Sequence, residues 1–135
     1  MRYPLRAVLS TAVATSCLLA GCGPGTADDV AQIRHVITAF SAAGGPSACG
    51  YLTTGALNEL FSANGHTTGE RKRAIAACVA KSRSFKGAPI DIGRVWFPTD
   101  PRTATALAHS RDRSSRWQVY LHKVGGRWLI AHIQH

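Results

Sequence analysis

The sequence predicts an α+β fold, in which N-terminal helices pack on one face of a curved antiparallel sheet. Up to Gly87 the apolar residues recur at helical spacing, and after Gly87 they follow the two-residue period of strands. Turn-forming residues at 98–101, 111–115 and 125–126 divide this second part into four strands. Helices followed by a strand meander are typical of the α+β class.

The first residues have the pattern of an export signal. Arg2 and Arg6 precede an apolar run at 7–20 that is diluted by serine and threonine. This run is shorter and more polar than the roughly 20 apolar residues that a membrane-spanning helix needs. It is therefore predicted to be a secretory signal that is removed.

The residues Leu19-Ala20-Gly21-Cys22 resemble the lipobox of bacterial lipoproteins. The resemblance implies cleavage before Cys22, diacylglycerol on its thiol, and often a further acyl chain, such as palmitate, on the new amino terminus. Two or more acyl chains give a stable anchor. We therefore expect a lipid-anchored protein on the extracytoplasmic face of the cell membrane; the alternative is a plain secretory signal with a chance cysteine.

Removal of residues 1–21 leaves 114 of the 135 residues, which suits a single domain. The expected organisation is a signal peptide at 1–21, a tether at 22–27 and one α+β domain at 28–135. The net charge falls from +9 to +7 because two arginines leave with the signal. A positive domain at a membrane can favour anionic head groups or wall polymers; ordinary solubilising charge is the alternative.

The cysteines predict a structural disulfide. Cys17 leaves with the signal and Cys22 carries lipid, so Cys49 and Cys78 remain in an oxidising compartment, where a pair is usually bridged. A redox pair more often has Cys-x-x-Cys spacing, and a metal site needs further ligands nearby. Neither pattern is present.

The first predicted helix is capped by Asp28 or Asp29 and ends at Gly44-Gly45. Its apolar stripe consists of Val30, Ile33, Ile37 and Phe40. His35 lies off that stripe, so we expect it to be solvated. A short helical piece follows Pro46, and another helix starts at Thr53 or Thr54.

The last predicted helix follows a polar loop at 62–68. Thr67-x-x-Glu70 has the spacing of a capping box. The inner face of this helix would hold Ile75, Cys78 and Val79, so Cys78 points inward, where Cys49 can meet it.

Strands are predicted at 90–97, 102–110, 116–124 and 127–134. Gly125-Gly126 is a two-residue hairpin signal, and this turn sets a register that includes Val119–His132 and Trp117–Gln134. Cross-strand partners share a face. The more apolar face, assigned to the helices, holds Trp117, Val119, Leu121, Trp128, Ile130 and His132.

Four segments carry a resemblance to a known superfamily: "DDVAQIRHVITAF", "CGYLTTGALNEL", "AIAACVAKS" and "WQVYLHKVGGRWLIAHI". Their order and pattern resemble the cystatin-like α+β barrel of the NTF2-like superfamily, which includes many small exported lipoproteins. The resemblance implies a cone-shaped cavity between helices and sheet, and it also implies pairing of Cys49 with Cys78. The six residues of the inner face are therefore the candidate ligand-binding residues.

A catalytic role would need an acid or base in that cavity. His132 among apolar neighbours could be a general base or a ligand contact; a core histidine with a satisfied hydrogen bond is the alternative. Enzymes of the superfamily place an acid on a strand facing the cavity, helped by a tyrosine or a second acid. Here the only acid on a predicted strand is Asp91, and Tyr120 faces the other way. This departure puts inherited isomerase or hydrolase activity in doubt.

Other partners find little support in the sequence. The six histidines are scattered without ligand spacing, so no metal and no cofactor is expected. Nucleic acid is not expected at an exported site. The basic turn at Arg111, Arg113 and Arg116 could grip phosphate or carboxylate polymers, with a solvated loop as the alternative.

Three functions from different classes follow. The leading hypothesis is a non-catalytic envelope lipoprotein whose cone binds a small apolar ligand or another protein. The second is an enzyme acting on a lipid or polyketide-like substrate through His132 or Asp91. The third is a purely structural module whose cone is filled by its own side chains. An open cavity distinguishes the first hypothesis from the third.

Overall fold

The structure, a computed structural model, describes residues 25–62 and 68–135. The predicted signal peptide, Cys22 and the proposed capping residue Thr67 lie outside the described residues. Within the two described ranges, no helix is long and apolar enough to cross a membrane.

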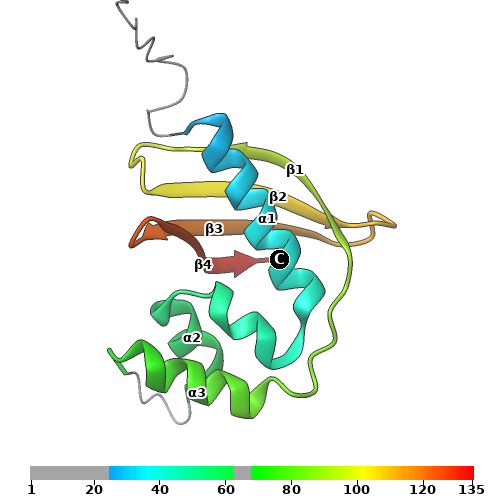
Figure 1. Ribbon diagram of the computed structural model, residues 1–135. Helices are drawn as coiled ribbons and strands as arrows, with labels where there is room; N and C mark the ends of the chain where they lie inside the picture. Colours follow the sequence, from blue (N-terminus) through cyan, green and yellow to red (C-terminus); the bar gives the residue numbers. More distant parts are fainter. Residues whose placement is uncertain (1–24, 63–67) are drawn as a thin grey trace, which may run out of the picture.

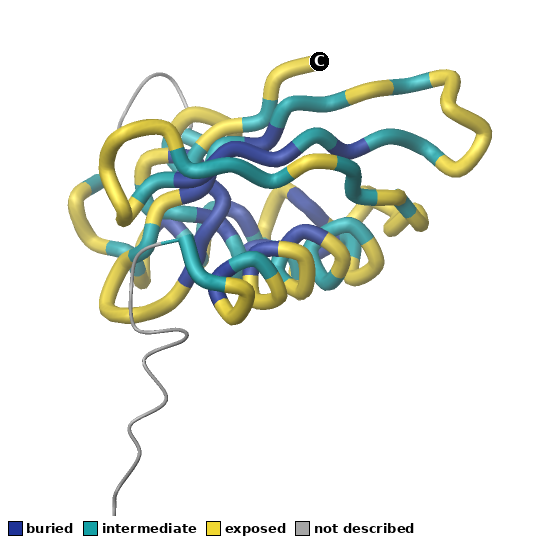
Figure 2. The backbone as a smooth tube through the Cα atoms, turned by 90° about the horizontal axis from the view of Figure 1, so that it is seen from above, coloured by how far each residue is buried: buried dark blue, intermediate teal, exposed yellow. Residues whose placement is uncertain are grey.

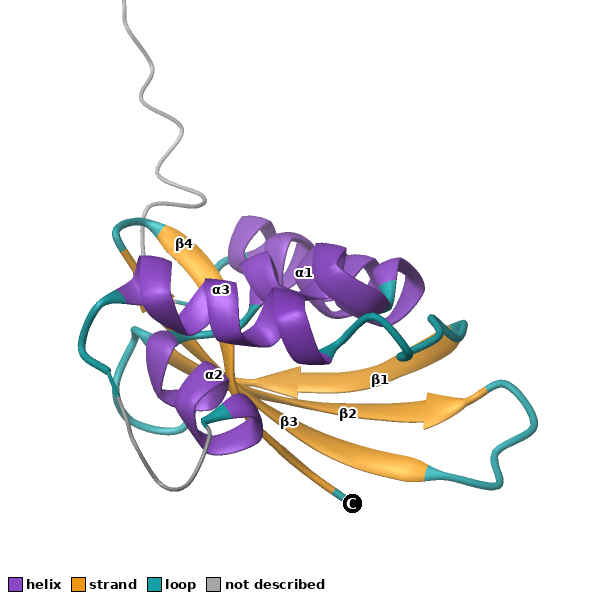
Figure 3. Cartoon of the chain, turned by 90° about the horizontal axis from the view of Figure 1, so that it is seen from below, coloured by secondary structure: helices purple, strands orange, loops and turns teal. Residues whose placement is uncertain are grey.

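Helices occupy the first part of the domain and strands the second, as predicted. In chain order the elements are α1 (Ala27–Ala43), the 3-10 helix η1 (Gly45–Tyr51), α2 (Thr54–Phe61), α3 (Arg71–Lys81), β1 (Ile90–Trp96), β2 (Thr103–Ser110), β3 (Arg116–Val124) and β4 (Arg127–Gln134). The four strands form one antiparallel sheet in the order β1-β2-β3-β4. The helices lie on one side of it (Figures 1 and 3), which confirms the predicted α+β class.

The core lies between the helices and the inner face of the sheet, where the backbone in Figure 2 is most buried. Ile33 and Ile37 of α1 are fully buried, and His35 is exposed, both as predicted. On β2 the inward positions are all alanine, namely Ala104, Ala106 and Ala108. Such small side chains leave space for the helices to approach this strand closely.

The amino end of α1 differs from the prediction. Its N-cap is Thr26, whose hydroxyl accepts a hydrogen bond from the Asp29 amide at 3.2 Å. The carboxylate of Asp29 is therefore not a cap, and it turns into the protein instead, where it is 6% exposed.

The predicted capping box before α3 is also wrong, because the helix begins at Arg71 with Glu70 as its N-cap. The side chain of Asn58 on α2 binds both backbone groups of Thr68, at 2.8 and 3.2 Å. The Thr68 hydroxyl accepts from the Glu70 amide at 3.2 Å. These bonds hold residues 68–70 in a turn, and a turn of this kind competes with helix.

The predicted hairpin between β3 and β4 is correct near its turn and wrong beyond it. Lys123 pairs with Trp128 and Leu121 with Ile130, but a bulge then lets Tyr120 pair with His132 and Val119 with Ile133. The extra residue on β4 is Ala131, and a bulge of this kind bends its strand. At the bend Ile130 also pairs with Leu52, and its carbonyl accepts from the Thr53 amide at 2.8 Å.

Candidate ligand-binding site

A cavity of about 370 Å³ lies at the end of the core where α1 terminates, and it is partly open to solvent. Its floor is the inner face of the sheet, and its walls come from the ends of the helices. The main lining residues are Ile37, Phe40, Ala48, Leu52, Leu60, Phe61, Cys78, Phe85, Ile90, Ala108, Trp117, Val119, Ile130 and Ile133. These side chains are apolar, and Ser41, Ser82 and Lys86 also line the cavity.

Small residues and a backbone crossing create this space. Ala48 and Ala108 line the cavity from two different elements, η1 and β2. The segment after α3 closes one wall by running past the end of α1, where the Ala88 amide donates to the Ser41 carbonyl at 2.9 Å. A Cβ atom on Gly44 or on Gly87 would collide with backbone at this crossing, so glycine is needed at both positions.

Two large apolar side chains lie at the rim of the cavity. Leu60 and Phe85 both line it and are each 57% exposed. Phe85 packs against the ring of Phe61, with 6.1 Å between the ring centroids. Val124, the other large apolar side chain with high exposure among the described residues, lies at the far end of β3 and does not line the cavity.

Of the six predicted ligand-binding residues, three line the cavity, two are buried elsewhere in the core, and His132 lies outside both. Trp117, Val119 and Ile130 line the cavity. Leu121 and Trp128 are buried in the same core but do not line it.

The placement of His132 on the inner face is wrong. Because of the bulge, Ile133 takes the inner position opposite Val119. His132 instead lies on the outer side, where its Nδ1 is 3.3 Å from the Glu59 carboxylate and its ring is 5.8 Å from that of Tyr120. No sequence signal located the bulge, since Ala131 fits a regular strand equally well.

No carboxylate or imidazole among the described residues lines the cavity. Asp91 is exposed, pairs in register with His109 and does not line the cavity, although its neighbour Ile90 does. Ser41 lines the cavity but donates to the Ala88 carbonyl, and the Ser82 hydroxyl lies 3.6 Å from the sulfur of Cys49. In the described part of the chain, no buried side-chain nitrogen or oxygen lacks a hydrogen-bond partner.

The disulfide between Cys49 and Cys78 is present, as predicted, with the two Cα atoms 6.0 Å apart. It joins η1 to α3, and Cys78 lines the cavity. The bridge therefore ties together two segments of the cavity wall.

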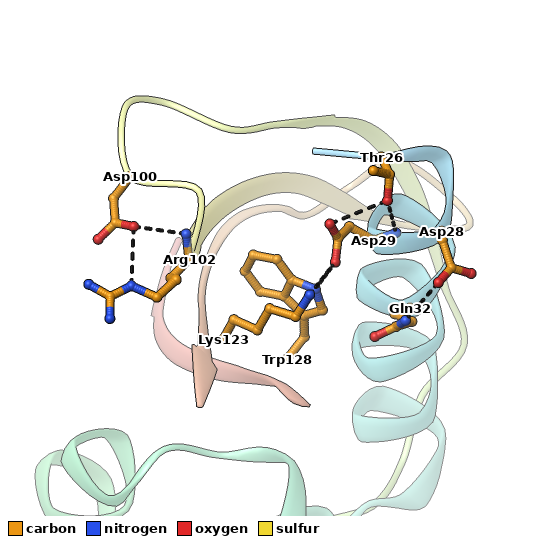
Figure 4. Close-up of polar contacts among 8 residues, drawn as sticks. All are labelled: Thr26, Asp28, Asp29, Gln32, Asp100, Arg102, Lys123 and Trp128. Carbon is orange, nitrogen blue, oxygen red and sulfur yellow. Dashed lines mark hydrogen bonds and ion pairs between the residues drawn. The ribbon is translucent and has the colours of Figure 1, made fainter. Parts of the chain in front are cut away.

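A buried polar cluster lies at the other end of the core (Figure 4). The Asp29 carboxylate accepts from the Lys123 ammonium at 2.8 Å and from the Trp128 indole at 2.9 Å. The hydrogen bond from Lys123, helped by the one from Trp128, lowers the pKa of Asp29, and burial opposes this shift. Asp29 is thus held as a carboxylate and bound to fixed partners, which fits a structural role.

Residues 25–62 and 68–135 contain no group of three or more His, Cys, Asp or Glu side chains that could hold a metal ion.

The basic turn between β2 and β3 is partly structured by Asp112. The Ser114 amide donates to its carboxylate at 3.0 Å, and the Ser110 hydroxyl donates to it as well. These bonds lower the pKa of Asp112 to about 2, and the hydrogen bond from Ser110 has the largest effect.

No family model matches this chain, and no curated protein matches it. Among solved structures, an NTF-2 like protein of unknown function from Silicibacter pomeroyi DSS-3 is similar at 15% identity, with 79% of this chain and 97% of that chain covered and a TM-score of 0.39. At this identity and TM-score the likeness assigns no function to this chain.

Proposed function

We propose that this protein is a membrane-anchored extracytoplasmic lipoprotein that binds a small apolar molecule in its cavity. The observation that carries this proposal is the partly open apolar cavity of about 370 Å³. Small-molecule sites typically have volumes of about 300–1,000 Å³ and predominantly apolar linings. The exposed rim residues Leu60 and Phe85 favour the same reading, because exposed apolar side chains grouped together often mark a binding surface.

The two alternative functions fit these contacts less well. A purely structural module would fill the cone with its own side chains, whereas here Ala48 and Ala108 leave it open. An enzyme would need an acid or base within reach of the substrate. His132 and Asp91, the two candidates, both lie outside the cavity lining.

We expect the substitution Ala48→Phe to abolish binding of an apolar probe. Ala48 lines the cavity from η1, so a phenyl ring there would occupy the space that a ligand needs. The measurement is fluorescence titration with the neutral dye N-phenyl-1-naphthylamine, for which we expect at least a tenfold loss of affinity. The control is Ala76→Phe, at an exposed position of α3 outside the lining.

Equal dye affinity in the two variants and the wild type would contradict the cavity as the binding site. Thermal unfolding of each variant shows whether it is folded. Should Ala48→Phe unfold, Leu60→Gln at the exposed rim provides a milder variant, with Val124→Gln as its control.

The anchoring part of the proposal rests on the lipobox-like sequence that ends at Cys22. The chain from Cys22 to Thr26, the N-cap of α1, spans at most about 14 Å. A lipid on Cys22 would therefore keep the amino end of α1 close to the membrane. Phe40, one of the residues that line the cavity, lies about 20 Å from Thr26 along the axis of α1.

We expect Cys22→Ala to produce a protein without lipid, because this thiol is the acceptor at the proposed cleavage site. Phase separation in a nonionic detergent measures the effect: the wild type should enter the detergent phase, and the variant should stay in the aqueous phase or keep its uncleaved signal. Cys17→Ala is the matched control, since Cys17 lies within the proposed signal. Detergent-phase partitioning of processed Cys22→Ala would refute lipidation at this residue.

A further inference from the structure

We propose that the ligand is a single-chain amphiphile with a negatively charged head, whose chain occupies the cavity and whose head lies at Lys86. This inference rests on the proposed function and adds the chemical class of the ligand. It depends on the charges around the cavity mouth and on the cavity's size.

Among the described residues, Lys86 is the only charged one that lines the cavity, and no acidic residue lines it. Lys86 lies next to the exposed rim residue Phe85, on the segment that links α3 to β1. The same segment contains Arg83, and Lys81 ends α3 just before it. No acidic residue occurs between Glu70 and Asp91, so this side of the mouth has a local excess of positive charge.

These charges are not neutralised within the described chain. All seven acidic residues of the protein lie in the described ranges. The ion pairs seen there are those of Glu70 with Arg73, Asp100 with Arg102, Asp29 with Lys123 and Glu59 with His132. The Lys81 ammonium donates to the Phe61 carbonyl at 2.7 Å, whereas Arg83 and Lys86 form no ion pair with any of these acids.

The cavity has the size for one alkyl chain. A dry apolar cavity of about 150 Å³ accommodates benzene, which has six carbons. Scaled in proportion, about 370 Å³ has space for on the order of 10–15 carbons. For a ligand of about ten carbons, the usual efficiency of small ligands gives a Kd on the order of tens of micromolar. Calorimetry measures affinities of this size well.

The test compares three ligands that share a ten-carbon chain and differ in the head: decanoate, decanol and decylammonium. Without the cations, decanoate would have no advantage over decanol, because a head at the open mouth stays hydrated in both ligands. We expect decanoate to bind about threefold to fivefold more tightly than decanol, in the range of a solvent-exposed ion pair, and decylammonium to bind most weakly. The preference should shrink at high salt.

Isothermal titration calorimetry of Lys86→Gln should then show a loss of about threefold for decanoate and no change for decanol. Lys72→Gln is the matched control, since Lys72 is exposed on α3 and does not line the cavity. Decanol binding as tightly as decanoate would overturn the proposal of an anionic head. An equal loss of decanoate affinity in both lysine variants would overturn it too. Either result would leave the proposed apolar site intact. Failure of all three ligands to bind would overturn the proposed function itself.

Discussion

Replacing Cys49 and Cys78 together by alanine is expected to lower the free energy of unfolding by roughly 3–4 kcal/mol. The two residues are 29 positions apart, so the bridge removes the entropy of a medium-length loop from the unfolded chain. For a domain of this size the expected drop in Tm is about 10–20 °C. The effect is large because domains typically have only about 5–15 kcal/mol in total.

Thermal unfolding followed by circular dichroism measures this change. The wild type in reductant is the control, because it should unfold at the same temperature as the double alanine variant. A thiol assay on the denatured, non-reduced mature protein should detect no free thiol from this pair. Two free thiols, or a Tm that reductant does not move, would contradict a structural role for the bridge.

Replacing Asp29 by asparagine should cost about 2 kcal/mol of stability. The substitution removes a buried negative charge that accepts from Lys123 at 2.8 Å and from Trp128 at 2.9 Å. Lys123 is left without its partner, but its side chain is 32% exposed and can reach water, which limits the loss. Asp28→Asn is the matched control, because Asp28 is exposed and its carboxylate accepts a hydrogen bond from the Gln32 side chain.

The same carboxylate should make the stability depend on pH. Its pKa is lowered in the folded protein from the ordinary value of 3.8, chiefly by the hydrogen bond from Lys123. The unfolded chain therefore takes up the proton first as the pH falls, and the contribution of Asp29 to stability, present above about pH 4, is lost below it. Tm should fall more steeply between pH 5 and pH 2.5 in the wild type than in Asp29→Asn. Parallel curves would show that the pair does not stabilise the fold.

The sequence predicted those features that repeat along the chain or have a strong local signal. The change from helical to strand period, the glycine pair of the last hairpin and the turns between strands all act over a few residues, so they are visible without the fold. The apolar stripe of α1 is correct for the same reason, with Ile33 and Ile37 fully buried. The disulfide was predictable because two cysteines remain to pair once the predicted export signal and the predicted lipid site are set aside.

The errors arose where distant segments meet. Thr26 caps α1, whereas the Asp29 carboxylate binds Lys123 and Trp128, which are more than ninety residues away. The bulge at Ala131 occurs where β4 also bonds to Thr53, so neither strand alone specifies it. The segment between α3 and β1 forms a wall of the cavity because it crosses the end of α1. These long-range contacts decide that Ile133, and not His132, faces the cavity.

The isoleucine side chains provide the most direct test of the binding cavity. Of the seven isoleucines, four line it, namely Ile37, Ile90, Ile130 and Ile133, whereas Ile33, Ile75 and Ile92 do not. The measurement is a titration of the protein, labelled with carbon-13 at the isoleucine methyl groups, with decanoate and with decanol, followed by NMR. Shifts that saturate at the four lining methyls and spare the other three are the expected result. No shifts with either ligand, or shifts centred on the other three isoleucines, would show that this cavity does not bind an apolar chain.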